Sequence, residues 1–310
     1  MVKFYDISSW EEHLYYSTGG TRNKVVVENP QNKFLYYFKT SYKKKSKDYI
    51  YEFWSEIISS EVGSFLGLDI LHYDVALRDG KLGCLSKSMI DQNNTLMEAY
   101  KWLQGFNEKY DANNKNDYTF QIIEKFLRRR FPSFIKNMIT MIVFDSIIGN
   151  EDRHQENWSI IETSIKKKRI LTKKIYTDIS YKFAPIYDSG SSLGRELTDE
   201  KVAKMLKDKN QLNAYVNRGR SEIHWKGEEG KQKHLNLISK ISNYGYKKEV
   251  EEIIISIKDK YNEKKIIDII NNIDNCLPKK LYKQKIPRTR KDFLVELLSL
   301  RFKKLFELKL

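Results

Sequence analysis

The sequence predicts an α+β protein in two lobes, a small β-rich lobe with one helix at residues 1–90 and a larger, mainly helical lobe at residues 91–310. Two observations support this division. Short runs of β-branched and aromatic residues, separated by turn residues, dominate the first lobe and surround one stretch of helical periodicity. In the second lobe apolar residues recur mainly at helical spacing.

The first lobe opens with a predicted hairpin. Residues 24–27 are rich in valine, residues 34–38 are mostly aromatic, and a turn containing Asn-Pro at residues 29–32 separates the two runs. Such runs are typical of paired strands. The lysine-rich stretch at residues 43–47 then predicts a loop.

The rest of the first lobe is predicted as one helix and two strands. Apolar residues recur every three or four positions between Phe53 and Leu66, and Gly67 follows as a C-terminal stop. Residues 71–77 and 82–85 are interpreted as strands around an Asp-Gly turn.

The second lobe is predicted to centre on a buried helix. Residues 132–148 begin with a proline, which suits a first helical turn, and are apolar on nearly every side. Trp54 and Trp158 are expected in the core. The other predicted elements are a helical pattern from residue 91, a loop at 107–117, a polar loop at 151–156, an apolar run at 158–161, a lysine-rich insertion at 166–174, a strand at 184–187 and C-terminal helices ending with 292–308.

The composition is that of a folded protein. Hydrophobic residues make up 40% and charged residues 31% of the chain, unlike the composition of disordered proteins. Cys84 and Cys276 are the two cysteines and lack metal-ligand spacing, which argues against a zinc site and favours a reducing, cytoplasmic location. We recognise no signal peptide and no apolar run long enough to span a membrane.

The formal charge of +15 favours anionic partners. The lysines are spread along the chain, however, and no RNA-binding or zinc-finger module is visible, so nucleic acid is not expected as the main ligand. The basic clusters at residues 128–130 and 166–168 are interpreted as solvated charge, with docking of an acidic partner as the alternative.

A polar segment after the buried helix carries the chemistry. Asp152 and Asn157 lie in it, and Asp188 follows a short apolar run further along the chain. Phosphoryl transfer needs a carboxylate to orient the attacking hydroxyl, oxygen ligands for magnesium and cations on the phosphates. Carboxylate and amide oxygens are ligands that suit magnesium. These three residues predict a phosphotransferase that uses ATP and Mg²⁺.

Candidates for phosphate contacts lie in the first lobe. Lys39 ends the aromatic strand, where its ammonium group suits the neutralisation of phosphates, and Glu56 on the following helix suits the holding of that lysine. The loop at residues 17–23 contains Gly19 and Gly20, whose backbone amides suit the covering of phosphates.

These residues resemble the motifs of the HipA-like kinases, most closely the short stand-alone members. Asp152-Arg153-His154 followed by Asn157 is similar to the catalytic loop of that family, and residues 184–188 resemble its metal-binding strand. The resemblance spans roughly residues 17–194 and also covers the Ser55-Glu56 pair, the Leu66-Gly67-Leu68 turn and the end of the helix before the loop.

The resemblance implies a two-lobed protein-kinase-like fold and a role for each site residue. Asp152 is the implied catalytic base, and Asn157 and Asp188 are the implied magnesium ligands. An inter-lobe hinge at residues 86–89 is implied to hold adenine. The resemblance also implies that His154 lies near the nucleotide. The alternative is that the His154 ring only holds the catalytic loop in its conformation. The implied nucleotide-binding set is Lys39, Glu56, Gly19, Gly20, Ser86, Lys87, Met89 and His154.

The resemblance further implies phosphorylation of a protein serine or threonine by a toxin-like bacterial enzyme. A substrate in the translation machinery and an antitoxin-like inhibitor are the expected partners, and autophosphorylation is expected at Ser17 or Thr18. One alternative is a lipid or small-molecule kinase, because phosphatidylinositol kinases have a similar order of Asp, Arg, His and Asn. Another is a non-catalytic pseudokinase or nucleic-acid-binding protein, which the presence of all three chemical residues disfavours.

Overall fold

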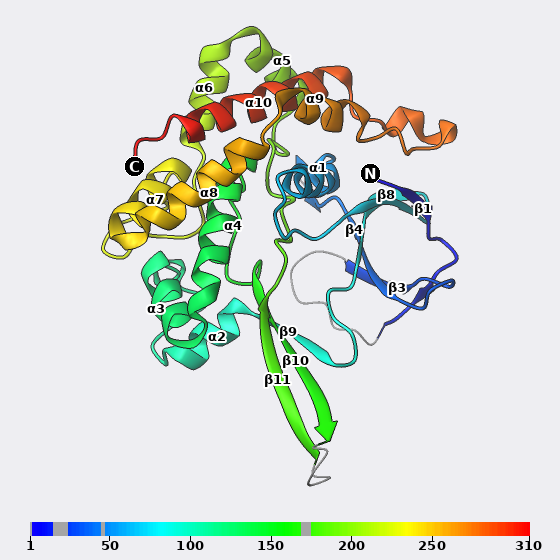
Figure 1. Ribbon diagram of the computed structural model, residues 1–310. Helices are drawn as coiled ribbons and strands as arrows, with labels where there is room; N and C mark the ends of the chain where they lie inside the picture. Colours follow the sequence, from blue (N-terminus) through cyan, green and yellow to red (C-terminus); the bar gives the residue numbers. More distant parts are fainter. Residues whose placement is uncertain (1, 15–23, 45–46, 169–174) are drawn as a thin grey trace.

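A computed structural model describes residues 2–14, 24–44, 47–168 and 175–310 of the chain. A β-sheet with one helix lies on one side of the molecule, and a larger group of helices lies on the other (Figure 1). The α+β class and the kinase-like division into a β-rich and a helical part are confirmed. Within the described residues, no helix is both long enough and apolar enough to cross a membrane.

Among the described residues, the sheet of the first lobe has six strands, and only the pair formed by β1 (Phe4–Asp6) and β7 (Asp74–Arg78) is parallel. Its hairpins form as predicted. The Asn29 carboxamide accepts a hydrogen bond from the Gln31 amide at 2.8 Å, and Asp79 and Gly80 adopt positive φ in the two-residue turn before the last strand. In spatial order the strands are β1 (Phe4–Asp6), β7 (Asp74–Arg78), β8 (Lys81–Lys87), β4 (Leu35–Thr40), β3 (Lys24–Glu28) and β2 (Glu11–Glu12).

Helix α1 (Glu52–Phe65) lies between this sheet and the helical lobe (Figure 1). Gly67 has a φ of 71° and ends the helix as predicted, since a left-handed residue closes the last turn. The prediction of a loop at residues 43–47 was wrong, because β5 (Lys43–Lys44) pairs with β6 (Lys47–Asp48). Lysine has low strand propensity, and the pairing depends on backbone hydrogen bonds that the composition does not reveal.

Helix α4 (Ile135–Ile148) is the centre of the helical lobe, as predicted. Ten of its fourteen residues are buried, and it packs against α3 (Phe120–Arg130), α7 (His234–Ile241), α8 (Lys247–Lys260) and α10 (Arg288–Phe306). Both Trp54 and Trp158 lie in the core. The other helices of this lobe are α2 (Ala99–Phe106), α3 (Phe120–Arg130), α5 (Asp199–Lys207), α6 (Lys209–Arg218), α7 (His234–Ile241), α8 (Lys247–Lys260), α9 (Glu263–Asn272) and α10 (Arg288–Phe306).

The second lobe contains a three-stranded sheet within the described residues, with β10 (Ser159–Lys168) between β11 (Ile175–Phe183) and β9 (Asn94–Glu98). The β10–β11 hairpin projects from the body of the molecule (Figure 1). The prediction of a helix from residue 91 onward was wrong for the residues of β9. These residues pair with β10, and that pairing outweighs their weak local pattern. The described part of the predicted lysine-rich insertion belongs to β10, and its residues 169–174 lie outside the described chain.

The strand predicted at residues 184–187 is not formed. Ala184 donates a backbone hydrogen bond to Ser159, whereas Ile186 exchanges two with the Asp69–Leu71 segment, so only an isolated bridge to Ile70 results. The last helix begins at Arg288 and not at residue 292, because Arg290 and Lys291 are buried in ion pairs and do not mark a surface loop.

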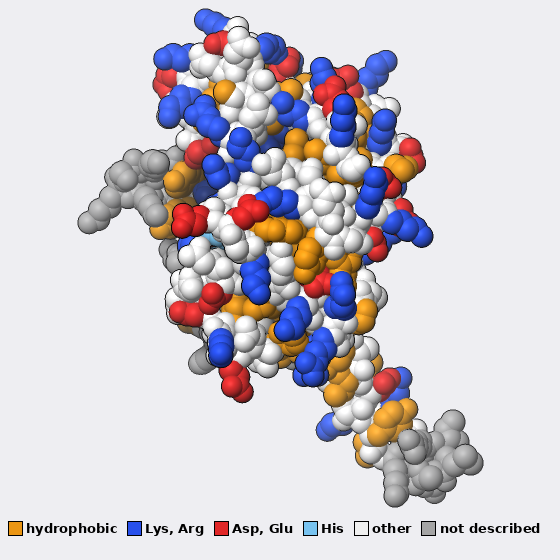
Figure 2. All heavy atoms as spheres, turned by 90° about the vertical axis from the view of Figure 1, so that its left-hand side faces the viewer, with side chains coloured by type: hydrophobic (Ala, Val, Ile, Leu, Met, Phe, Trp, Pro, Cys, Tyr) orange, Lys and Arg blue, Asp and Glu red, His pale blue; other side chains and the backbone are white. Residues whose placement is uncertain are grey.

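The predicted basic clusters lie on exposed segments. Arg128 pairs with Glu124 on α3, and Lys167 pairs with Asp178 across the β10–β11 hairpin. On the face shown in Figure 2, basic side chains are scattered among acidic ones and do not form one continuous patch. This distribution agrees with the interpretation of solvated charge.

Candidate active site

The polar loop begins where Gly149 ends α4 in a left-handed conformation, with a φ of 67°. A Cβ atom at this position would lie 2.4 Å from Nη2 of Arg301, so the close approach of α10 also requires glycine. The Asn150 amide then donates to the Asp145 carbonyl at 3.0 Å, and the Asn150 carboxamide donates to the Asp145 carboxylate at the same distance. The loop is therefore anchored to a rigid, buried helix.

Arg153 is the centre of the loop and is fully buried. Its Nε and Nη2 donate to the two carboxylate oxygens of Asp145 at 3.0 and 2.9 Å. Nη1 donates to the backbone carbonyls of Asn157, at 2.7 Å, and Tyr187, and Nη2 also reaches the Ser189 hydroxyl at 3.2 Å. One guanidinium thus joins α4, the polar loop and the segment that carries Asp188.

Asp152 and Asn157 are positioned by short hydrogen bonds. The carboxylate of Asp152 accepts from the Ser191 hydroxyl at 3.1 Å, and its amide donates to the Asn150 side chain at 3.2 Å. The Asn157 side-chain nitrogen donates to the Asp152 carbonyl at 2.7 Å. Because that bond uses the nitrogen, the amide oxygen is the atom that Asn157 offers to a metal.

Asp188 adopts a left-handed backbone, with a φ of 55°, which is rare for a residue other than glycine. Its side chain is buried, and its Oδ1 lies 3.4 Å from Nζ of Lys39. The next amide, of Ser189, donates to the Glu56 carboxylate at 2.8 Å. The turn at Asp188 therefore points the carboxylate into the space between the two lobes.

Lys39 on β4 joins the two lobes through its ammonium group. Besides Asp188, it lies 3.7 Å from Oε1 of Glu56 on α1, and all three side chains are buried. Burial by itself lowers the pKa of Lys39, but the charges of Asp188 and Glu56 outweigh it and hold the pKa well above its usual value. A permanently charged ammonium group is thereby fixed beside the candidate metal ligand.

A cavity of about 420 Å³ adjoins Lys39 and lies between the sheet and the β9–α2 segment. Ser86 and Met89 line it together with apolar side chains such as Leu71 and Leu96. The lining also includes charged side chains such as Lys24, Lys101 and Glu98, so the cavity combines apolar and charged walls. Its volume is in the range that small-molecule ligands occupy.

Not all predicted site residues meet at this cavity. The Lys87 ammonium group lies over the Phe34 ring, 3.3 Å from its centroid, and not among the residues that line the cavity. His154 is partly exposed, and its Nδ1 accepts from the Glu156 amide at 3.3 Å, as the loop-fixing alternative predicts. The predicted residues Ser17, Thr18, Gly19 and Gly20 lie outside the described residues.

The sequence interpretation gave no role to Arg153 or Asp145, although their ion pair supports the whole loop. A signal for it exists in the sequence. Asp145 is the one acidic residue in the otherwise apolar run of α4, and a charge in a buried helix requires a partner.

No family model matches the chain, but comparisons with known proteins find relatives. The serine/threonine-protein kinase CtkA of Helicobacter pylori is 27% identical over 132 residues, which are 43% of this chain. The match covers only 36% of the length of that protein. The crystal structure of the H. pylori proinflammatory kinase CtkA superposes with a TM-score of 0.78 at 21% identity, covering 100% of this chain and 99% of the other. The chain is homologous to CtkA.

A second solved structure with a related fold is HipA of Shewanella oneidensis, in a toxin–antitoxin complex with HipB and operator DNA. Its TM-score is 0.52 at 12% identity, over 96% of this chain and 66% of that one. This structure shows that the chain shares its fold with HipA, as the resemblance of the motifs implies. At these identities the two structural matches establish a common fold, and the activity is argued below from the site.

Proposed function

We propose that this chain is an ATP- and Mg²⁺-dependent serine/threonine protein kinase of the HipA-like type. One observation carries the proposal: Lys39, Glu56 and Asp188 meet in a buried charge cluster beside a cavity between the two lobes. A cation for phosphates, an acid that holds it and a carboxylate for magnesium are the parts that phosphoryl transfer requires.

In this proposal Asp152 orients the acceptor hydroxyl and accepts its proton during transfer. The Ser191 hydroxyl fixes the carboxylate for that task. Lys39 contacts the nucleotide phosphates, and Glu56 keeps the ammonium group in place. Ser86 and Met89 would contact adenine, which is supported by their place in the lining of the cavity, whereas the Lys87 side chain would make no contact with it.

The donor set fits magnesium. Asn157 and Asp188 offer one amide and one carboxylate oxygen, which are ligands that Mg²⁺ accepts, and Arg153 bonds the backbone beside both of them. Bound magnesium would neutralise negative charge on the phosphates. Without it, Lys39 and Asp188 neutralise each other.

We infer a protein acceptor because the named relative, CtkA, is a serine/threonine-protein kinase. The proposal also includes a substrate of the translation machinery, an antitoxin-like inhibitor and a cytoplasmic location. The boundary between the lobes is likewise proposed to lie near residue 90. Autophosphorylation at Ser17 or Thr18 also stays a prediction. HipB is the partner of HipA in that complex, and we do not propose it as a partner of this chain.

The proposal is tested by incubating the purified chain with γ-labelled ATP and a bacterial extract. We expect label on protein with Mg²⁺ and none after EDTA is added, because Asn157 and Asp188 require the metal to act on the phosphates. Hydrolysis of ATP with no labelled protein, and with label in the lipid fraction, would instead establish the phosphatidylinositol-kinase-like alternative. Absence of both ATP hydrolysis and label would establish a pseudokinase.

Lys39→Met is expected to raise the KM for ATP about 10- to 100-fold, because a charged contact to the phosphates is lost. Steady-state kinetics at saturating acceptor would measure it. Lys87→Met, on the neighbouring strand, is the matched control, since that ammonium group lies over Phe34 and outside the cavity. Equal losses in both variants would contradict the placement of Lys39 on the phosphates.

A further inference from the structure

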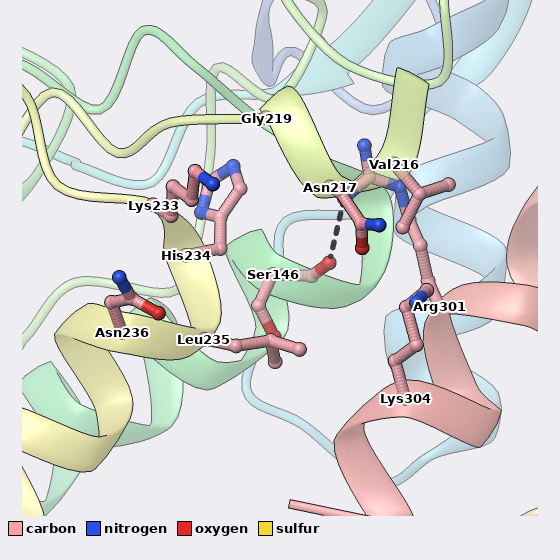
Figure 3. A pocket seen from close by; sticks show the side chains of 10 residues that line it. All are labelled: Ser146, Val216, Asn217, Gly219, Lys233, His234, Leu235, Asn236, Arg301 and Lys304. Atoms are coloured by element: carbon pink, nitrogen blue, oxygen red, sulfur yellow. Dashed lines mark hydrogen bonds between the residues drawn. The ribbon is translucent and has the colours of Figure 1, made fainter. Parts of the chain in front are cut away.

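A second cavity, of about 230 Å³, lies where the ends of α4 and α6 meet the beginning of α7 and the C-terminal part of α10. Figure 3 shows Lys233, His234 and Asn236 on one side of it and Arg301 and Lys304 on the other. No residue of the candidate active site lines this cavity. It is thus a separate site in the helical lobe.

Two buried side chains of this cavity, in the part of the chain that the structure describes, have polar atoms without a hydrogen-bond partner. His234 is 4% exposed, and neither of its ring nitrogens has a hydrogen-bond partner. Arg301 is 6% exposed and donates from Nη1 to the Ser146 carbonyl at 3.1 Å, but its Nε has no partner. Buried polar groups of native proteins are normally hydrogen-bonded, so the unpaired atoms of both side chains are available to bind a ligand.

Arg301 is also a buried cation without a close counter-ion. No carboxylate of the described residues lies within 4.0 Å of it, and Glu151 and Glu196 act on it only from farther away. Burial lowers the pKa of Arg301, and burial together with the charge of Arg301 lowers the pKa of His234 to about 3. The imidazole is therefore neutral at pH 7, and an anion beside Arg301 would relieve an unfavourable buried charge.

The beginning of α7 adds backbone donors. Lys233 is the N-cap residue and makes no side-chain cap. The His234 amide donates to the Gly219 carbonyl, but in the described chain no partner is recorded for the amides of Leu235 and Asn236. Uncapped amides and the helix dipole make such a helix start favourable for an anion.

Two lysines complete the charge of the cavity. Lys233 comes from the α7 side and Lys304 from α10, and neither has a carboxylate within 4.0 Å in the part of the chain that the structure describes. Three cationic side chains therefore face one small cavity (Figure 3). A dianion matches this arrangement better than a carboxylate, which carries a single charge.

We propose that this cavity binds a phosphate monoester dianion, of the kind carried by a phosphorylated serine or threonine. The volume of about 230 Å³ holds a phosphate group and the first atoms of the side chain that carries it. The site lies behind the candidate catalytic loop, because a Cβ atom on Gly219 would be 3.5 Å from Oε1 of Glu151 and 3.3 Å from Nη2 of Arg301. Glu151 directly precedes Asp152, so the cavity lies close to the base of that loop.

The test is calorimetric titration of the full chain, without ATP or Mg²⁺, with a phosphoserine peptide, the same peptide unphosphorylated, and inorganic phosphate. We compare the wild type with the double variant Lys233→Ala/Lys304→Ala. The charge-matched control is Lys226→Ala/Lys303→Ala, which removes two exposed lysines outside the cavity. Leaving Arg301 intact avoids a variant that fails to fold.

We expect the cavity variant to bind the phosphorylated peptide about 100-fold more weakly than the wild type, because each lost charged contact lowers the affinity about tenfold. The control variant is expected to bind the peptide as the wild type does. Tighter binding of the phosphopeptide than of phosphate would identify a protein-borne ligand, whereas equal affinities would identify the free anion. Equal weakening in both double variants, or no saturable binding by any phosphate, would overturn the proposal. Since no turnover is measured, the result is independent of the proposed kinase activity.

Discussion

Asp152→Asn is expected to lower kcat for protein phosphorylation about 10²- to 10⁴-fold while leaving the folded structure intact. The amide keeps the shape of the carboxylate and its contact with the Ser191 hydroxyl, but it does not accept the proton of the attacking group. Single-turnover transfer from γ-labelled ATP at saturating Mg²⁺ measures the effect. The melting temperature of the variant is expected to equal that of the wild type.

The matched control is Asp259→Asn, which makes the same chemical change on an exposed position of α8. We expect it to retain wild-type turnover. If Asp152→Asn also retained full turnover, the role of Asp152 as catalytic base would be refuted, and the loop would have to act through another residue.

Arg153→Met is expected to lower the free energy of unfolding by about 3–5 kcal/mol, because it leaves the buried Asp145 carboxylate without its partner. The carbonyls of Asn157 and Tyr187 lose their common donor at the same time. Urea denaturation at pH 7 measures the change. We expect activity to be lost as well, since the backbone beside both candidate metal ligands is released.

Arg288→Met tests whether this loss is specific. Arg288 forms an ion pair with Asp292 at 2.9 Å, the same length as the Arg153–Asp145 pair, but the Arg288 side chain is 72% exposed. Exposed pairs contribute little to stability, so we expect no measurable change. Adding Asp145→Leu to Arg153→Met should restore part of the lost stability, because the unpaired carboxylate is removed. A loss below 1 kcal/mol for Arg153→Met would contradict the central role of this pair.

Elements with a long, regular pattern were predictable from sequence. Helix α4 is apolar on nearly every side, and the Asp79-Gly80 turn has a strong local preference, so local chemistry and tertiary structure favour the same conformation. Strand β9 was missed because its five residues gain their order from pairing with β10. The strand expected at residues 184–187 does not form, because the backbone hydrogen bonds of this segment are divided between Ser159 and the Asp69–Leu71 segment.

The candidate site was predictable where the spacing of residues is informative. Asp152, Asn157 and Asp188 could be selected by type and order, and the structure brings Lys39 and Glu56 to Asp188 from a different lobe. Arg153 could not be selected in this way, because an arginine in a polar loop usually indicates exposed charge. The second cavity is assembled from four helices distant in sequence, so neither Lys233 nor Arg301 stands out before folding.

Helix α1 is bonded more extensively to the helical lobe than its place in the first lobe suggests. Ser55 donates to the Ser192 carbonyl at 3.2 Å, the hydroxyls of Ser59 and Ser192 lie 3.2 Å apart, and Glu56 accepts from the Ser189 amide. The same helix is also bonded to the first lobe, where the Phe53 amide donates to the Ser41 hydroxyl at 3.2 Å and the Ser60 hydroxyl donates to the Leu71 carbonyl at 2.7 Å. Because α1 is attached on both sides, any opening of the lobes would have to break bonds on one side of it, and this double attachment leaves little freedom for control by an outward swing of α1 alone.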